Sequence, residues 1–401
     1  MIEASGTRPV TLLMAGMRFE EWSRVEVARD LQDIAGKFRL ELRDSARSWR
    51  TFPFATLADM KGEVELGLEA TILLDGEQVL SGWVDDLAPH ASEGQVSVSI
   101  SGQDKTGDLS DCAATVDGPA EYFGKTIDTV AGEILKPYGL KVRAEADVGD
   151  PFDRFAIDVG ETALSAIEKG ARQRGLLVTS DGMDTLLLTQ SGGKRAPGDL
   201  IFPGNIVESG GHFSLRGRHS AYHVKGQAER AGGRRRKTVH LDGHAEPLTG
   251  EQGDWQAQQG PHEKAGVTIK GQADDAAMKR RHRPLVAMGR TQLTPKGAQD
   301  QAEWMRRTAR GRSEELTYQV RGFRHNGRLW RPNELGMVQD AFQGVYREML
   351  IAGVAYQYDD EGAATHLRVT GPEAYDMQDE GTRRKNHKSQ QPLDRHAEPL
   401  G

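Results

Sequence analysis

The feature that most restricts the fold of this chain is a strict alternation of apolar and polar residues in its first hundred positions. Residues 95–101 alternate without interruption, with three aliphatic side chains on one side. A period of two is that of a β-strand with one buried face. The same alternation at 38–42, and an Asp75–Gly76 pair between two apolar runs, predict further strands and a tight hairpin. We expect a small antiparallel barrel or sandwich here.

Glycine content supports a chain with many turns. Glycine supplies 47 of the 401 residues and proline only 16. The glycine share is about 12%, against a usual value of about 7%. The sequence lacks the three-residue period of collagen. The surplus therefore indicates tight turns between short strands.

Between residues 119 and 200 the pattern becomes that of amphipathic helices. Four apolar residues from Phe123 to Ile134 follow a 4-3-4 spacing, which predicts a helix over 121–136 that buries them. A second helix is expected at 161–174. Two leucine-rich runs on either side of Asp181–Gly182 predict a hairpin.

Strand patterns return after residue 206, interrupted by a long segment. Residues 213–227 have a strand pattern, and residues 228–262, rich in Gly, Arg and Gln, are expected to form a long loop. Alanine spacing after Pro295 predicts a third helix, and four more strands are expected up to residue 369. The tail at 378–401 has almost no apolar residue and is expected to be disordered.

Two segments share a plan. Residues 66–104 and 335–373 both contain a strand, a turn, a second strand, and a third strand, with glycines at similar spacings. This near-repeat indicates two β-units of similar design on either side of the helical region. A chance similarity between two β-meanders is the alternative.

Charge is distributed unevenly along the chain. The formal net charge of −7 argues against a protein that coats nucleic acid. Residues 59–111 hold twelve acidic residues and two lysines, whereas 206–295 hold fifteen basic and nine acidic residues. The basic runs are Arg234-Arg235-Arg236-Lys237 and Lys279-Arg280-Arg281-His282-Arg283. A solvated loop, phosphate contact and docking onto an acidic neighbour are the three interpretations. Acidic and basic units could also pack head-to-tail around a ring.

No motif predicts catalysis, a cofactor or a metal site. Lys105–Thr106 lacks the glycines of a phosphate-binding loop. The lone Cys112 is expected to be a small buried apolar side chain. His240 and His244 bracket a turn and could share a metal, but surface histidines explain the pair better. Asp85 and Asp86 are adjacent on a strand and are expected to point to opposite faces, so they cannot form a glycosidase dyad. We expect a protein that is not an enzyme.

Several short motifs occur in a defined order over residues 1–376. They are LSGWVDD at 80–86, SVSISGQDKTGDL at 97–109, ETAL at 161–164, GLLVTSDG at 175–182, SAYHVKGQ at 220–227, RHRPL at 281–285, AEW at 302–304, YQVRG at 318–322 and LWRPN at 329–333. Each motif is short. Their order over nearly the whole chain resembles that of the baseplate hub proteins, or tail tube-initiating hubs, of Mu-like contractile-tailed bacteriophages.

The resemblance implies an α+β, mainly β fold with two related antiparallel tube-type β-barrels. By family analogy the parts are a first barrel at 1–109, an α+β module at 110–206, a second barrel at 207–228 plus 313–376, an inserted basic module with a helix at 229–312, and a disordered tail at 377–401. The near-repeat agrees with two barrels of one plan.

The resemblance also implies a structural function in the virion. Three copies would form a homotrimer whose six barrels make a pseudo-sixfold ring. That ring would join the tail tube protein to the central spike protein, and pass DNA and the tape-measure protein without sequence-specific binding. The chain would be made in the host cytoplasm, and its apolar run at 11–17 is too short to cross a membrane.

Two sets of charged residues are candidates for this role. We expect Asp85, Asp86 and Glu93 to line the lumen, where like charge would keep DNA from binding, or else to serve outer-surface solubility. A basic docking surface is expected at Arg234, Arg235, Arg236, Lys237, Arg280, Arg281 and Arg283. The alternative functions are a tail-tip protein that degrades the cell wall or binds glycan, and a double-stranded DNA-binding protein.

Overall fold

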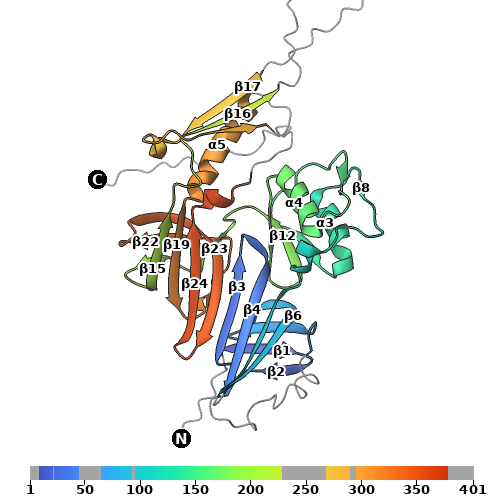
Figure 1. The fold of residues 1–401 in the computed structure, drawn as a ribbon, viewed down its shortest axis with the longest axis vertical. Coiled ribbons are helices and arrows are strands. Elements are labelled where there is room, and N and C mark those ends of the chain that lie inside the picture. Colours follow the sequence, from blue (N-terminus) through green and yellow to red (C-terminus); the bar gives the residue numbers. More distant parts are fainter. Residues whose placement is uncertain are drawn as a thin grey trace, which may run out of the picture.

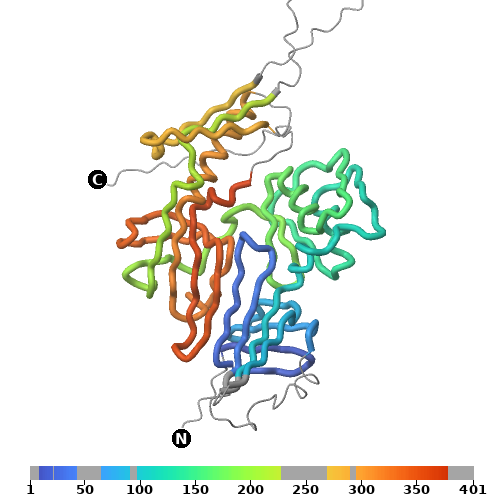
Figure 2. Tube along the Cα trace, viewed as in Figure 1, coloured from blue at the N-terminus to red at the C-terminus, as the bar shows by residue number. Residues whose placement is uncertain are grey.

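The computed structural model describes residues 9–20, 22–44, 65–92, 95–227, 268–289 and 295–377. The largest unit is one 14-stranded, mainly antiparallel sheet, with two smaller units of helix and strand at one end of it (Figure 1). The backbone trace in Figure 2 places blue segments from early in the chain beside red segments from its end. The mainly β fold class expected from the sequence is confirmed.

The first seven strands form the N-terminal lobe. They are β1 (Val10–Met14), β2 (Met17–Phe19), β3 (Arg24–Asp30), β4 (Asp33–Asp44), β5 (Glu69–Leu74), β6 (Glu77–Ser92) and β7 (Gln95–Asp104), in the sheet order β3-β4-β7-β6-β5-β1-β2. The predicted alternation is present in β7, where Val98 and Ile100 are buried and Ser99 between them is not. Asp75 and Gly76 form the β5–β6 turn with φ of 48° and 79°, as an Asp-Gly pair predicts.

Seven later strands form the C-terminal lobe. They are β13 (Lys194–Arg195), β14 (Leu200–Phe202), β15 (Ile206–Phe213), β19 (Glu314–Arg321), β22 (Glu334–Asp340), β23 (Val345–Asp359) and β24 (Gly362–Thr370). The order β15-β19-β24-β23 is antiparallel, and β22 pairs with the first half of β23. A short hairpin of β20 (Arg324–His325) and β21 (Arg328–Leu329) completes this part of the chain.

The two lobes are parts of one sheet because β23 pairs with β3. We call this pairing of β23 with β3 the inner joint. It is antiparallel and extends from Gly353 opposite Asp30 to Tyr358 opposite Val25. Apolar residues of both lobes form one continuous core. The two related tube-type barrels expected from the sequence are not confirmed, since the described strands form one continuous sheet and no closed barrel. Pairing across the joint covers two strand edges that an isolated lobe would expose.

The near-repeat of the sequence corresponds to a repeated structural unit. In β5–β6–β7 and in β22–β23–β24, a short strand pairs with the first half of a long strand, which then pairs with a third strand. Both long strands contain a register shift, between Val84 and Asp86 in β6 and between Ile351 and Gly353 in β23. A bulge bends a strand and increases its twist. The two long strands therefore bend at corresponding places.

The middle module, residues 106–190, contains most of the helices. Its elements are α2 (Asp108–Asp111), β8 (Glu121–Tyr122), α3 (Ile127–Leu135), η1 (Lys136–Tyr138), β9 (Lys141–Ala144), β10 (Phe155–Ala156), α4 (Ala163–Gln173), β11 (Leu177–Ser180) and β12 (Thr185–Thr189). The first helix begins later than predicted because Gly124 has φ of 61° and the residues before it form β8, paired with β10. Phe123 is consequently 63% exposed rather than buried.

A buried carboxylate connects this module to the N-terminal lobe. Asp104, at the end of β7, accepts hydrogen bonds from the N–H groups of Gly36 and Thr106 at 2.9 Å and from the Ser180 hydroxyl at 3.1 Å. Burial raises the pKa of the Asp104 carboxyl. Ser180 ends β11, in the hairpin that the leucine-rich runs predict. That hairpin is thus the part of the module that docks on the sheet.

The inserted module lies between Ser214 and Ser313, whose N–H and carbonyl are hydrogen-bonded at 2.8 Å. Its elements are β16 (Ala221–Gln227), β17 (Thr268–Asp274), η2 (Ala276–Met278), β18 (Pro284–Met288) and α5 (Pro295–Gly311), and the short helix η3 (Pro372–Tyr375) packs on α5. Its three strands form a separate sheet in the order β17-β16-β18. Residues 207–228 were expected in the second barrel, but within that range 221–227 pair with β17 and β18 instead.

Candidate functional site

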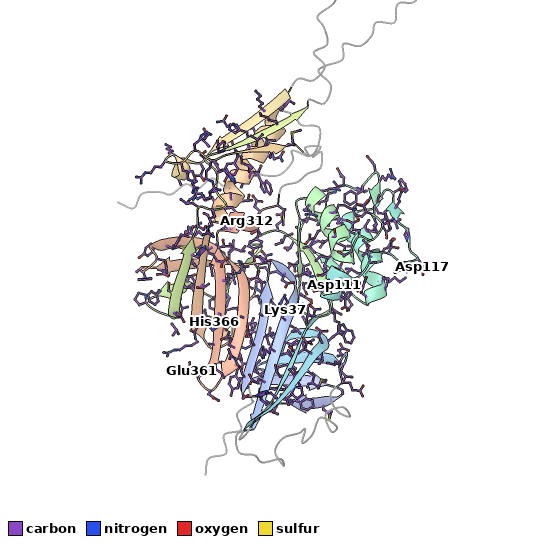
Figure 3. All side chains as sticks on the ribbon, in the orientation of Figure 1. Lys37, Asp111, Asp117, Arg312, Glu361 and His366 are labelled. Atoms are coloured by element: carbon purple, nitrogen blue, oxygen red, sulfur yellow. The ribbon has the colours of Figure 1, made fainter. Side chains whose placement is uncertain are left out.

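Eight consecutive strands of the large sheet have one face on the core and one polar face. This eight-strand run has the order β15-β19-β24-β23-β3-β4-β7-β6. Directly paired residues of neighbouring strands share a face of a sheet, so the register defines the polar face. The following polar residues lie on it, and none of them is buried: Glu26, Lys37, Arg39, Glu41, Asp86, Ser99, Ser101, Gln103, Gln319, Gln357 and His366. Figure 3 labels Lys37 on β4 and His366 on β24.

The polar face is of mixed charge rather than uniformly acidic. Lys37 is 2.5 Å from Asp33 in an ion pair, and Arg39 donates to the Ser99 hydroxyl at 3.1 Å. Arg368 forms ion pairs with Asp30 on β3 and with Glu315 on β19. Opposite charges placed on adjacent strands partly cancel. The face therefore offers short-range hydrogen bonding without a strong field of one sign.

The eight-strand run ends in two open edges. β15 pairs on one side with β19, and within the described residues no strand pairs with its other side. The first half of β6 pairs with β5 up to Trp83, whereas Asp86–Ser92 pair only with β7 among the described strands. Unpaired backbone N–H and C=O groups on such edges are templates for strand addition.

Two of the predicted acidic residues lie where β6 becomes an edge, and Glu93 lies outside the described residues. Asp85 and Asp86 are both exposed. The expectation that they point to opposite faces is wrong in its premise, because the register shift after Val84 makes Asp85 an extra residue in the strand. Partial burial of its carboxyl group nevertheless raises the pKa of Asp85, and the charges of Asp108 and Asp86 raise it further. We call Asp85 and Asp86 the acidic bulge.

The predicted basic residues do not form one described surface. Arg234, Arg235, Arg236 and Lys237 lie outside the described residues. Arg280 and Arg281 are exposed just after η2. Arg283 instead donates to the carbonyls of Leu215 and Arg216 at 3.1 and 3.0 Å, which ties β18 to the start of the inserted module.

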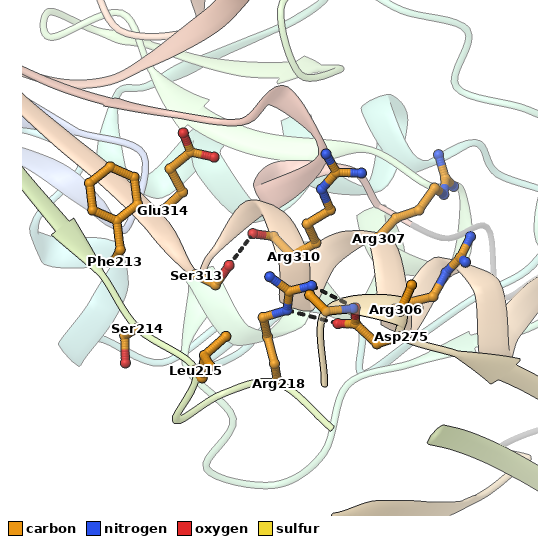
Figure 4. Close-up of a pocket in the computed structure, with 12 residues that line it drawn as sticks. Phe213, Ser214, Leu215, Arg218, Asp275, Arg306, Arg307, Arg310, Ser313 and Glu314 are labelled. Atoms are coloured by element: carbon orange, nitrogen blue, oxygen red, sulfur yellow. Dashed lines mark hydrogen bonds and ion pairs between the residues drawn. The ribbon is translucent and has the colours of Figure 1, made fainter. Parts of the chain in front are cut away.

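A cavity of about 750 Å³, lined by four arginines and shown in Figure 4, was not predicted from the sequence. Arg218 forms a bidentate ion pair with Asp275, in which its Nε and Nη2 donate to the two carboxylate oxygens at 2.7 and 2.6 Å. Arg306, Arg307 and Arg310 come from the last turns of α5. We call this the arginine pocket. Spacings of three and four residues place side chains on one face of a helix, so the α5 arginines were a signal available in the sequence.

The pocket lies at the end of β15, where the chain leaves the large sheet. Phe213, Ser214 and Leu215 form part of its wall, and Phe213 ends β15. Phe213 and Leu215 are 56% and 49% exposed. A charged cavity with exposed apolar side chains at its rim has the composition of a protein-binding surface.

Features of an enzyme or metal site do not come together in the described part of the chain. No group of three or more His, Cys, Asp or Glu side chains there is arranged to hold a metal ion. His240 and His244 lie outside the described residues. Cys112 is exposed, which corrects the expectation that it is buried. Among the described helices, none is long and apolar enough to cross a membrane.

Three family models match successive parts of the chain. Residues 9–104 match the N-terminal domain of "Mu phage baseplate assembly protein GpP-like", residues 106–190 match the second domain of "Baseplate hub protein gp44-like", and residues 294–378 match the fourth domain of "Mu phage baseplate assembly protein GpP". The first two boundaries coincide with the N-terminal lobe and the middle module.

Relatives match over nearly the whole chain. The baseplate hub protein gp44 of Escherichia phage Mu is 28% identical over 94% of this chain and 92% of its own length. The 43 kDa tail protein of prophage MuSo2 from Shewanella oneidensis is 30% identical, with a TM-score of 0.74, over 92% of this chain and 99% of that one. A tail protein from Neisseria meningitidis shares the fold, with a TM-score of 0.68 at 19% identity over 93% of this chain and 99% of that one. The chain belongs to the baseplate hub family of Mu-like contractile-tailed phages and has a structural role in the phage tail.

Proposed function

We propose that three copies of this chain close into a pseudo-sixfold ring that joins the tail tube to the central spike. The observation that carries the proposal is the inner joint, where β23 of one lobe pairs with β3 of the other. Each lobe contributes four strands of the same order to the eight-strand run. Two such lobes already stand side by side in one chain, and three chains supply six.

The inner joint also supplies a template for a joint between copies. The register matches β3 with β15, β4 with β19, β7 with β24, and β6 with β23. When the register shift of β6 is aligned with that of β23, Asp86 corresponds to Gly353. Following the strand pairs across each lobe from there, Ser214, just after β15, corresponds to Asp30 at the end of β3. The open half of β6 in one copy then pairs with β15 of the next. Ala88 lies opposite His212, in the position of the inner Ala355–Ala28 pair.

Ring closure explains why both edges of the run stay open in a single copy. A closed ring of strands has no unpaired edge. Pro89 lies on the open half of β6 and corresponds to Tyr356 of β23. Because proline has no amide hydrogen, Pro89 and the β15 residue opposite it can form at most one backbone hydrogen bond. Proline on an edge strand also reduces indiscriminate strand pairing before assembly.

The polar face would line the lumen of this ring. Its small and hydroxylated side chains on β7, and its paired charges on β4 and β24, suit the passage of DNA and of a tape-measure protein without sequence-specific binding. Asp86 lies on this face, at the seam between copies. The lumen charge we propose is thus mixed, with acidity concentrated at the seams.

The ring is tested by mass and by cross-linking. Sedimentation of the full chain is expected to give a trimer, with a central hole in negative-stain images. In a Cys112→Ser background, Ala88→Cys combined with His212→Cys is expected to give a covalent trimer on oxidation, because opposed Cβ atoms lie about 5 Å apart.

The matched control combines Ala88→Cys with Glu208→Cys. Glu208 is on the same face of β15, four residues from His212, or about 13 Å along the strand. A monomer at all concentrations contradicts the ring. Equal cross-linking of both pairs contradicts the register.

A further inference from the structure

The arginine pocket holds positive charge that its own chain neutralises only in part. Arg218 is satisfied by Asp275, and Arg307 forms an ion pair with Asp376 at 2.9 Å. Arg306 reaches the Asp274 carbonyl at 3.4 Å. Arg310 is exposed and has no ion-pair partner in the described part of the chain. The pocket can therefore accept further acidic groups.

The acidic bulge has the opposite property. Asp85 and Asp86 are exposed next to Asp108, and no basic side chain among the described residues pairs with either. The bulge lies where β6 becomes an open edge. Two adjacent carboxylates on an unpaired edge repel one another, and this repulsion is relieved when cations approach.

The inner joint shows what stands at these positions when the strands pair. There the N–H of Leu31, in the β3–β4 turn, donates to the carbonyl of Ala352, the bulge residue of β23, at 2.8 Å. We call the proposed pairing of β6 in one copy with β15 of the next the outer joint. By the register described above, the corresponding residues at the outer joint are Leu215 and Asp85. Leu215 forms part of the wall of the arginine pocket. The bulge of the next copy is thereby brought to that pocket.

The inner joint is itself crossed by an ion pair at this level. Arg368 on β24 reaches over Gly353 to Asp30 on β3, with one hydrogen bond of 2.8 Å. A Cβ at Gly353 would lie 2.3 Å from an Asp30 oxygen, so a side chain there would displace the Asp30 carboxylate from this ion pair. At the outer joint Asp86 replaces Gly353, and Ser101 and Ser214 replace Arg368 and Asp30. The acid now stands on the long strand, and its base must come from the facing copy.

We propose that the acidic bulge of one copy docks at the mouth of the arginine pocket of the next, where Asp85 and Asp86 pair with Arg310 and Arg306. This inference rests on the ring proposed above, and names the charged contact that fixes its register. It also assigns a use to the inserted module, which carries the pocket on the outer edge of each copy.

The test measures trimer dissociation of the full chain by sedimentation at several salt concentrations. Asp85→Asn combined with Asp86→Asn is expected to raise the dissociation constant about tenfold at low salt, and to weaken its dependence on salt. The matched control is Asp360→Asn with Glu361→Gln, two exposed acids at the β23–β24 turn, where Figure 3 labels Glu361. That control is expected to leave the trimer unchanged.

Charge reversal makes the partner specific. Asp85→Arg alone and Arg310→Asp alone are each expected to weaken the trimer, and the two changes in one chain to restore it, since every seam then holds a reversed pair. If the wild-type chain forms a trimer but the bulge variant dissociates like the control, the docking contact is wrong and the ring stands. If the wild-type chain is monomeric throughout, the ring fails and the docking contact fails with it.

Discussion

The two lobes share a strand order but differ at the turn between their first two strands. In the N-terminal lobe, β3 passes to β4 through Leu31 and Gln32. In the C-terminal lobe, residues 214–313 separate β15 from β19, and the first and last of them, Ser214 and Ser313, are hydrogen-bonded to one another. A long insertion costs little when its ends stay in place. Strand register therefore sets the order of the strands in both lobes, whereas additional chain is inserted at the end of a hairpin.

The lobes also fill their cores by opposite choices. Phe38 packs over Gly102 in the N-terminal lobe, and the corresponding pair in the C-terminal lobe is Leu316 with Val369. The N-terminal lobe thus pairs a large side chain with a glycine, where the C-terminal lobe pairs two side chains of medium size. Core volume is thus maintained although neither position keeps its residue type.

The largest loss of stability is expected when Gly102, which makes room for Phe38, is replaced by a larger residue. A Cβ at Gly102 would lie 1.9 Å from the Trp83 carbonyl and 2.9 Å from the Phe38 ring. Gly102→Val is therefore expected to cost more than about 4 kcal/mol of unfolding free energy. Val369→Ala, the matched change in the other lobe, is expected to cost about 2 kcal/mol. Urea unfolding checks both, and equal costs would contradict the comparison.

A smaller effect is expected from the ion pair at the inner joint. Arg368 is 18% exposed and joins Asp30 to Glu315 across the strands. Arg368→Ala leaves two partly buried carboxylates without their cation and is expected to cost about 2 kcal/mol. Ser101→Ala, at the corresponding position of the N-terminal lobe, is expected to stay within about 0.5 kcal/mol. Similar losses in the two variants would show that the inner joint does not depend on this contact.

Next in size is the buried hydroxyl of Tyr356, which donates to the Trp330 carbonyl. Tyr356→Phe leaves that carbonyl without its partner and is expected to cost about 1 kcal/mol at neutral pH. Burial raises the pKa of Tyr356 to about 12. A raised pKa means that this contribution is complete below about pH 10, the usual tyrosine value, and is lost as pH rises through 12.

The wild-type chain is therefore expected to lose stability in that alkaline window faster than the Tyr356→Phe variant. Thermal unfolding at a series of pH values up to 11.5 measures the difference. Other tyrosines affect both proteins alike, so parallel curves would contradict the assignment to Tyr356.

The smallest effect is expected from an exposed pair outside the sheet. Lys141 donates to Asp184 at 2.7 Å, and this hydrogen bond lowers the pKa of the Asp184 carboxyl. A lowered pKa means that the contribution is present above the ordinary aspartate pKa and is lost as pH falls through the folded-state value. Compared with Gly102→Val, Arg368→Ala and Tyr356→Phe, Asp184→Asn is expected to change the melting temperature least. At acidic pH, where Asp184 is protonated, it is expected to melt at the same temperature as the wild type. A larger change than that of Tyr356→Phe would reverse the ranking.

Local patterns predicted the local parts of this fold. The Asp75–Gly76 hairpin, the alternation in β7 and the helix at 163–173 follow from turn chemistry and periodicity. The first helix of the middle module was predicted too long because Gly124 interrupts a spacing that otherwise continues. The acidic bulge was identified by residue, but its geometry was not, since a register shift depends on the facing strand.

The sequence by itself determined that the chain is mainly β, that it repeats one unit twice, and to which family it belongs. Only the tertiary structure decided that β3 and β23 pair, and that Asp30 meets Arg368 across 338 positions of the chain. It also decided that the arginines of α5 face the end of β15. The physical reason is range. Periodicity and turn residues act over a few positions, whereas strand partners and pockets depend on which distant segments exclude water together.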